Sequence, residues 1–167
     1  MKKEENNSII LFLSLKRISK TCIEKAIEIA KKENLTLLTY YVVTSEQIKY
    51  LSKTIEELGF IGFEATQKVS SLLENEESLK AKKVIGWVND KALSNSVNNT
   101  SSIIHGDFYK VVKDMIKKHK PDKIILTRAH WGFITKQWFG SVVDKLLKTE
   151  SCPIIIVEKK KNDDIFI

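Results

Sequence analysis

The sequence has only two cysteines, Cys22 and Cys152, in 167 residues. Two cysteines do not make the disulfide framework that stabilises small secreted domains, so the sequence favours a protein of the reducing cytoplasm. We expect both thiols to be small buried hydrophobic groups and not nucleophiles. The three histidines, His105, His119 and His130, share no metal-ligand spacing with one another or with the cysteines, so we expect no zinc site.

Long hydrophobic runs are also missing, since no apolar stretch approaches the roughly 20 residues that a membrane span requires. The run IILFLSL has the length of a signal-peptide core, but no small-residue cleavage site follows it. A hydrophobic content of 43% in 167 residues is typical of one globular domain with a sizeable core. We therefore expect one domain, residues 1–158, with no membrane contact. The charged tail, residues 159–167, should be mobile or used in a contact.

Glycine-rich signatures of nucleotide-cleaving enzymes are absent as well. The sequence contains no Walker sequence and no paired-glycine dinucleotide fingerprint. Ser141 and Asp144 lie close together, but no histidine is placed by sequence to act as the base of a triad. The sequence thus predicts no catalytic residues.

The net charge of +7 is concentrated in the second half of the chain. Residues 1–80 carry 12 basic and 12 acidic side chains, whereas residues 81–167 carry 16 basic and 9 acidic ones. Many of these lysines fall on the outer face of the amphipathic segment KVVKDMIKKHKPDK, and a solvated helix face is the simpler interpretation. A basic nucleic-acid-binding module is the alternative, in which Trp131 and Trp138 are exposed stacking platforms.

Short apolar runs alternate with helical segments along the chain. Strands buried on both faces are predicted for SIILFLSL, NLTLLTYYVVTS, DKIILT and CPIIIV, and a weaker strand is predicted near residues 97–104. Helices are predicted for residues 19–34, most of residues 46–93, FYKVVKDMIKKH and SVVDKLLKT, with Ser19 and Asp107 as caps. This alternation predicts a single-domain α/β fold, with a mainly parallel sheet and helices on both faces.

With the elements in this order, the chain resembles the universal stress protein family, a branch of the adenine-nucleotide-binding α/β folds. The resemblance covers Ile9 to Val157 and rests on the segments CIEKAIEIAKKENLTLL, HGDFYKVVKDMIKKHKPDKIIL and GSVVDKLLKTESCPIIIV. It implies a Rossmann-like five-stranded sheet in the order 3-2-1-4-5. It also implies a non-catalytic regulatory role in the stress response, acting through protein partners, and a homodimer formed through the last strand, Pro153 to Val157.

Nucleotide-binding members of that family carry the motif G-x2-G-x9-G-[ST] after the fourth strand. Counting back from Gly140 and Ser141 places the first two motif glycines at Thr127 and His130, so only the last pair is kept. The family's first strand commonly ends in an aspartate that contacts the ribose, and Ser14 stands there. The resemblance therefore implies an adenine-nucleotide site altered at three positions and lined by Ser14, Val42, Leu126, Thr127, Arg128, His130, Gly140, Ser141 and Val142.

These alterations predict that ATP binds weakly or not at all. Glycine lets backbone amides approach a phosphate closely, and the side chains of Thr127 and His130 obstruct that approach. The amides of Gly140 and Ser141 are expected to open the following helix and so keep a dipole that favours anions.

Two other interpretations of the loop stay open. In one, Arg128, His130 or Gly132 rebuilds the cradle in a nucleotide-binding or hydrolysing member, with Asp144 as the nearby carboxylate for a metal. In the other, His130 and the two neighbouring tryptophans pack the cleft shut. Weak ATP hydrolysis belongs to the first interpretation.

Overall fold

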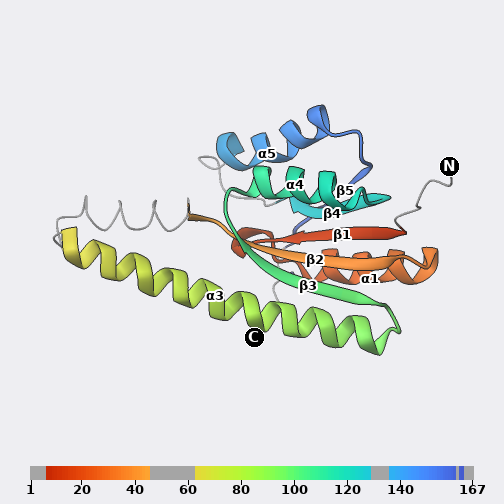
Figure 1. Ribbon diagram of the computed structural model, residues 1–167, viewed down its shortest axis with the longest axis horizontal. Coiled ribbons are helices and arrows are strands. Elements are labelled where there is room, and N and C mark those ends of the chain that lie inside the picture. The colour runs from red at the N-terminus through yellow and green to blue at the C-terminus, as the bar shows by residue number, and fades with distance from the viewer. Residues whose placement is uncertain (1–6, 46–62, 129–135, 161, 164–167) are drawn as a thin grey trace.

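The structure is a computed structural model that describes residues 7–45, 63–128, 136–160 and 162–163. Its strands are β1 (Ser8–Leu13), β2 (Thr36–Val43), β3 (Asn99–His105), β4 (Lys123–Arg128) and β5 (Ile154–Glu158). They form one five-stranded sheet in the order β3-β2-β1-β4-β5, and each neighbouring pair is parallel (Figure 1). The predicted fold class and strand order are therefore confirmed.

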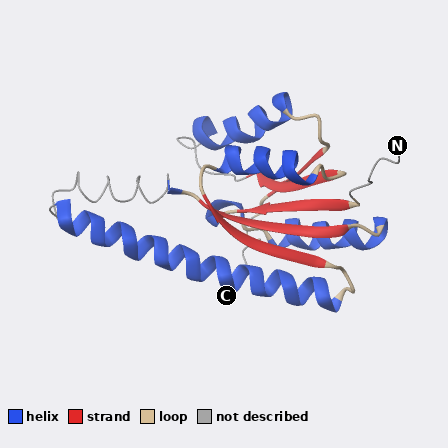
Figure 2. Cartoon of the chain, in the orientation of Figure 1, coloured by secondary structure: helices blue, strands red, loops and turns tan. Residues whose placement is uncertain are grey.

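Helices cover both faces of this sheet (Figure 2). They are α1 (Lys20–Glu33), α3 (Phe63–Ser94), α4 (Phe108–His119) and α5 (Lys136–Thr149), and a single 3-10 turn, η1 (Leu15–Arg17), follows β1. Helices α1 and α3 pack on one face, and α4 and α5 pack on the other. Among the described residues, none of these helices has the length and apolar character to span a bilayer.

The core has two layers because successive side chains of a strand point to opposite faces of the sheet. From β1, Ile9, Leu11 and Leu13 pack against α1 and α3, while Ile10 and Phe12 pack against α4 and α5. All five side chains are fully buried. A strand that is covered on both sides needs this unbroken apolar sequence, which explains the run SIILFL.

The helix starts predicted at Ser19 and Asp107 are confirmed. The Ser19 hydroxyl accepts a hydrogen bond from the backbone N–H of Cys22 at 3.0 Å, and the Asp107 carboxylate accepts one from Lys110 at 2.8 Å. Cys22 lies on the buried face of α1, as expected, and Cys152 is half-buried. Both caps fix the residue at which a helix begins after a strand, and so they shape the end of the sheet where the candidate site lies.

Helix α3 has 32 residues and extends beyond the strands at its N-terminal end (Figure 1). Its C-terminal half covers the sheet through a stripe of small and β-branched residues, namely Ala81, Val84, Val88 and Ala92. The helix predicted after residue 62 is thereby confirmed, while residues 46–62 lie outside the described part of the chain.

Candidate functional site

The carboxyl ends of β1, β2 and β4 meet at one edge of the sheet, which we call the carboxyl edge. Leu13 of β1 pairs with Tyr41 of β2, and Phe12 pairs with Leu126 of β4. Because the strands are parallel, Ser14 follows β1 at the level of Val42 in β2, and Thr127 of β4 lies one residue earlier, level with Leu13. The strand order reverses between β1 and β4, and such a switch point is where open α/β sheets bind ligands.

Both altered positions that the structure describes at this edge are buried. Ser14 is 2% exposed and precedes η1, where its carbonyl accepts a 2.7 Å hydrogen bond from the backbone N–H of Arg17. Thr127 is fully buried on the α1 side of β4, and its hydroxyl faces the Cys22 thiol. Burial raises the pKa of the Cys22 thiol to about 12, and the contact with the Thr127 hydroxyl opposes this shift. Cys22 is therefore a protonated core thiol at neutral pH.

Arg128, the proposed side-chain donor to an anion, contacts two carboxylates. Its guanidinium lies 3.6 Å from an oxygen of Asp144 on α5 and 3.7 Å from an oxygen of Glu158 on β5. Asp144 was also the carboxylate available to a metal in the hydrolytic interpretation. In this arrangement the two candidate groups bind each other, so a phosphate or a metal has to compete with an existing ion pair.

The expectation that Gly140 and Ser141 open a helix is wrong. Helix α5 begins at Lys136, so the glycine is its fifth residue and the serine its sixth. The free amides of a helix belong to its first four residues, and the amides of this pair lie beyond them. The backbone amides of Gly140 and Ser141 therefore do not present the N-terminal end of a helix dipole to an anion.

The remaining predicted site residues lie in three places. Val42 and Leu126 are buried in β2 and β4, and Val142 is half-buried against the core beneath α4 and α5. His130 lies outside the described residues, as do Trp131 and Gly132, so the structure does not place them.

Arg17 is a charged residue of this edge that the sequence analysis missed. It is only 3% exposed, and its guanidinium lies 4.4 Å from the centre of the Phe108 ring, at the start of α4. Burial lowers the pKa of Arg17 to about 10, so the side chain remains a cation at neutral pH. A basic residue four positions after the end of a buried strand was the available signal. The carboxyl edge thus holds a buried positive charge.

Glu77 is a second residue that was missed, because it lies on the inner face of α3. It is 5% exposed, and one of its carboxyl oxygens has no hydrogen-bond partner among the described residues. Burial and the charge of Glu74 together raise the pKa of Glu77 to about 7, against a backbone hydrogen bond from Thr44 that opposes the shift. Thr44 follows β2, so this titratable carboxyl belongs to the carboxyl edge.

Replacing Glu77 with glutamine should stabilise the protein at pH 8 and have little effect at pH 4. The folded protein holds a proton at Glu77 up to a pKa of about 7, against an ordinary value of 4.5. Stability therefore falls as pH rises between these values, and Glu77→Gln removes this loss, giving a gain of roughly 2 kcal/mol at pH 8. Urea unfolding at both pH values measures the difference.

The exposed residue Glu28 of α1 provides the control for this experiment. Glu28→Gln removes the same charge without altering a buried group, so its unfolding free energy should change little at either pH. A gain for Glu77→Gln that is equal at pH 4 and pH 8 would show that the buried carboxyl does not titrate in this range.

The C-terminal tail reaches the same edge through Asp163. Its carboxylate accepts hydrogen bonds from the Ser19 hydroxyl, from the Thr21 backbone N–H at 2.8 Å and from the Thr21 hydroxyl at 2.7 Å. Burial alone raises the pKa of Asp163, but these hydrogen bonds hold the pKa below its ordinary value. The first turn of α1 has no acidic residue of its own, so Asp163 supplies the negative charge that the helix dipole favours. The tail is thus used in a contact, one of the two outcomes expected for it.

Comparisons with known proteins agree with this geometry. A model described as the universal stress protein family matches residues 7–158. The universal stress protein UspA from Lactobacillus plantarum is 18% identical, with a TM-score of 0.66 over 90% of this chain and 97% of that one. A universal stress protein from Archaeoglobus fulgidus in complex with dAMP is 11% identical, with a TM-score of 0.56 over 89% and 95%.

A third similar structure is a universal stress protein family protein from Arabidopsis thaliana with AMP bound. It is 14% identical, with a TM-score of 0.53 over 93% of this chain and 94% of that one. At sequence identities this low, the likeness of these three structures to the present chain is a likeness of fold alone. A search of curated proteins found no match.

Proposed function

Because this chain belongs to the universal stress protein family, we propose that it is a non-catalytic regulator of the stress response with a degenerate adenine-nucleotide site at the carboxyl edge. It acts as a homodimer in the cytoplasm, through protein partners. The observation that carries the site is the adjacency of Ser14 and Thr127 at the ends of the two strands that flank the switch point.

The altered residues support a weak site. Thr127 is fully buried where the family motif has a glycine, and Ser14 replaces the ribose-binding carboxylate. Against these losses, Arg17 keeps a buried positive charge at the edge, which favours an anionic ligand. Relatives with dAMP or AMP bound make an adenine nucleotide the first ligand to test. We therefore infer adenine-nucleotide binding that is much weaker than in a member with an intact motif.

Titration with ATP, ADP and AMP, with and without magnesium, tests this function. We expect dissociation constants above about 100 μM, because each lost contact weakens binding by roughly tenfold per 1.4 kcal/mol. Tryptophan fluorescence provides the signal, since Trp131 lies in the candidate loop sequence. The double variant Thr127→Gly, His130→Gly should bind at least about tenfold more tightly.

Thr127→Ser, which keeps the hydroxyl facing Cys22, is the matched control. Because it restores no backbone space, its affinity should equal that of the unmodified protein. Thermal unfolding of each variant separates a change in binding from a loss of fold. Micromolar ATP binding by the unmodified protein would contradict a degenerate site and favour a rebuilt loop. No binding by either protein would indicate that the cleft has closed.

A nucleotide-hydrolysing member remains the second candidate. It needs a carboxylate that positions a metal, and Asp144 is the nearby group. The contact of Asp144 with Arg128 at 3.6 Å weighs against this role. Measured phosphate release from ATP with magnesium, abolished by Asp144→Asn, would favour the enzyme.

The sheet supports a homodimer through β5, which is one of its two edge strands. Ile154, Ile155 and Ile156 are each half-buried within the single chain. An apolar edge strand with free backbone groups invites pairing with another strand, and pairing across a two-fold axis covers it. We therefore propose that β5 pairs with its symmetry copy.

A further inference from the structure

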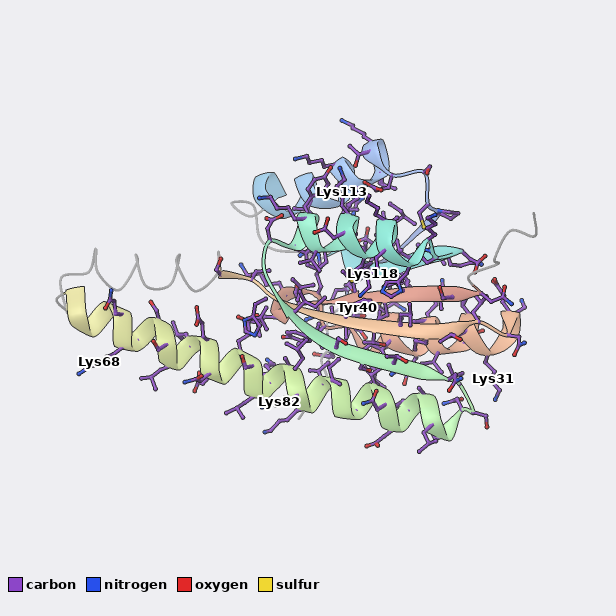
Figure 3. All side chains as sticks on the ribbon, in the orientation of Figure 1. Lys31, Tyr40, Lys68, Lys82, Lys113 and Lys118 are labelled. Carbon is purple, nitrogen blue, oxygen red and sulfur yellow. The ribbon has the colours of Figure 1, made fainter. Side chains whose placement is uncertain are left out.

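A carboxyl group forms the buried contact of the N-terminal part of α3 with the sheet. Among residues 67–80, whose side chains the structure describes, Glu77 alone is buried. The apolar stripe that packs into the core begins one turn later, at Ala81. Figure 3 shows Lys68 on the part of the helix that extends beyond the strands. The contact of this end of α3 with the sheet therefore centres on Glu77.

Glu77 meets the sheet at the carboxyl end of β2. The backbone N–H of Thr44 donates a hydrogen bond to its carboxyl group. Tyr41 of β2 lies close by, since burial and then the charge of Glu77 raise the pKa of its phenol. The Tyr41 hydroxyl and one carboxyl oxygen of Glu77 are both buried without a hydrogen-bond partner among the described residues. A buried carboxylate with an unpaired oxygen costs free energy, so this environment favours the protonated form.

The charged groups around Glu77 do not favour its ionised form. On α3 itself, the charge of Glu74, one turn earlier, opposes ionisation, whereas Lys80, one turn later, is exposed to solvent. Helix α3 packs against β2, β3 and α1. Near Glu77 these elements carry Tyr41, the exposed His105 on the same face of β3 as Ile103, and the exposed pair of Lys20 with Glu24 on α1. Ionisation of Glu77 therefore adds a second negative charge beside Glu74.

We propose that the N-terminal part of α3 is a pH-dependent cover over the end of β2, which the protonated carboxyl of Glu77 holds in place and the ionised carboxylate releases. Release exposes this part of the carboxyl edge, where Tyr41 and Thr44 are buried. The released carboxylate bonds to water, which satisfies both of its oxygens. The rest of α3 stays on the sheet, because the stripe from Ala81 to Ala92 has no titratable group. This device does not depend on which ligand the carboxyl edge binds.

The direction of the pH effect follows from the two states of the helix. When α3 is docked the pKa of Glu77 is about 7, and on release it returns to its ordinary value of 4.5. Docking is therefore most favourable below the lower value, weakens as pH rises between the two values, and is weakest above the higher one. Between pH 5 and pH 8, the ratio of released to docked helix should rise on the order of 50-fold.

Hydrogen exchange of backbone amides, followed by mass spectrometry, tests this release. Between pH 5 and pH 8, protection of residues 70–80 should fall on the order of 50-fold more in the unmodified protein than in Glu77→Gln. The chemical exchange rate also rises with pH, but it does so equally in both proteins, so the comparison removes it. Glu28→Gln, which removes an exposed charge on α1, should behave as the unmodified protein does.

Low concentrations of urea separate local release from global unfolding. Release exposes little surface, so exchange in residues 70–80 should hardly respond to about 1 M urea, whereas exchange through global unfolding responds strongly. Residues 85–92, which the apolar stripe holds on the sheet, should be at least about tenfold better protected than residues 70–80 at pH 8.

Glu74→Gln is a second variant, which leaves Glu77 in place. Because it removes a like charge, it lowers the pKa of Glu77, and the change in protection between pH 5 and pH 8 should become smaller. Glu76→Gln, the same substitution at another exposed position of α3, is the matched control and should leave the change as it is. Equal effects of the two variants would contradict the proposal, since the response would then follow net charge.

Two further results would overturn the proposal. One is a pH dependence of exchange in residues 70–80 that is the same in the unmodified protein and in Glu77→Gln. The other is equal protection and equal urea dependence of residues 70–80 and 85–92 at pH 8, which indicates that ionisation weakens the whole fold and does not release one end of α3. Circular dichroism of each variant confirms that the fold is kept.

Discussion

Ile155→Asp is expected to convert the proposed dimer into monomers. Ile155 belongs to β5 and is half-buried in the single chain, so a second β5 covers the rest of it in the dimer. A carboxylate there has to be buried without a partner or keep the two strands apart, and either alternative costs several kcal/mol. Light scattering at about 10 μM reports the mass of the particle and so distinguishes a dimer from a monomer.

A matched control is available on the other edge of the sheet. Ile103 of β3 and Ile155 are both half-buried, and both pack against the core layer beneath α1 and α3. Ile103→Asp should therefore cost similar folding stability while leaving a dimer. If both variants weaken dimer formation equally, the loss of the dimer comes from damage to the core and not from β5. If the unmodified protein is already a monomer at this concentration, β5 does not pair.

Asp163→Ala is expected to destabilise the protein by about 3 kcal/mol at pH 7. The carboxylate accepts three hydrogen bonds at the start of α1, and each hydrogen bond to a charged group contributes about 1.5–3 kcal/mol. The expected loss is smaller than the sum of the three, because in the variant the donors of Ser19 and Thr21 bond to water instead. Urea unfolding followed by circular dichroism measures the loss. A change below about 0.5 kcal/mol, the range of ordinary surface substitutions, would show that the tail does not stabilise α1.

The pH dependence of this loss separates charge from shape. The pKa of Asp163 lies below its ordinary value of 3.8 in the folded protein, so its stabilisation is present above that value and is lost as pH falls through the folded pKa. The unmodified protein and Asp163→Ala should therefore converge in stability near pH 2. Asp163→Asn keeps an acceptor without the charge and should lose about half as much at pH 7.

Much of the fold was predictable because local patterns and tertiary structure agree. The run SIILFL has the unbroken apolar sequence of a strand covered on both faces, and Ser19 and Asp107 are the residues that cap helices best. Strand β3 was the weakest prediction. Its sequence NTSSIIH places polar groups at an edge of the sheet, where burial does not enforce an apolar pattern.

The candidate site was less predictable because it depends on contacts between distant residues. A glycine followed by a serine is typical of a helix start, yet α5 begins four residues before Gly140. The position of Glu77 depends on which face of α3 meets the sheet, and the helical pattern alone did not identify that face. Ser19 and Asp163 are 144 residues apart, and no spacing rule connects them.

The contact between Asp163 and α1 also bears on the order of events during synthesis. Helix α1 leaves the ribosome long before Asp163 does, and until then Ser19 is the cap that its own sequence provides. The central strand β1 likewise lacks its neighbour β4 until residue 128 has been made. A chain that stops after β5 therefore contains all five strands of the described sheet but leaves the start of α1 open, and local unfolding there exposes it to proteases. The segment after β5 acts in this way as a check that synthesis has passed the last strand of the sheet, since only a copy that contains Asp163 closes the start of α1.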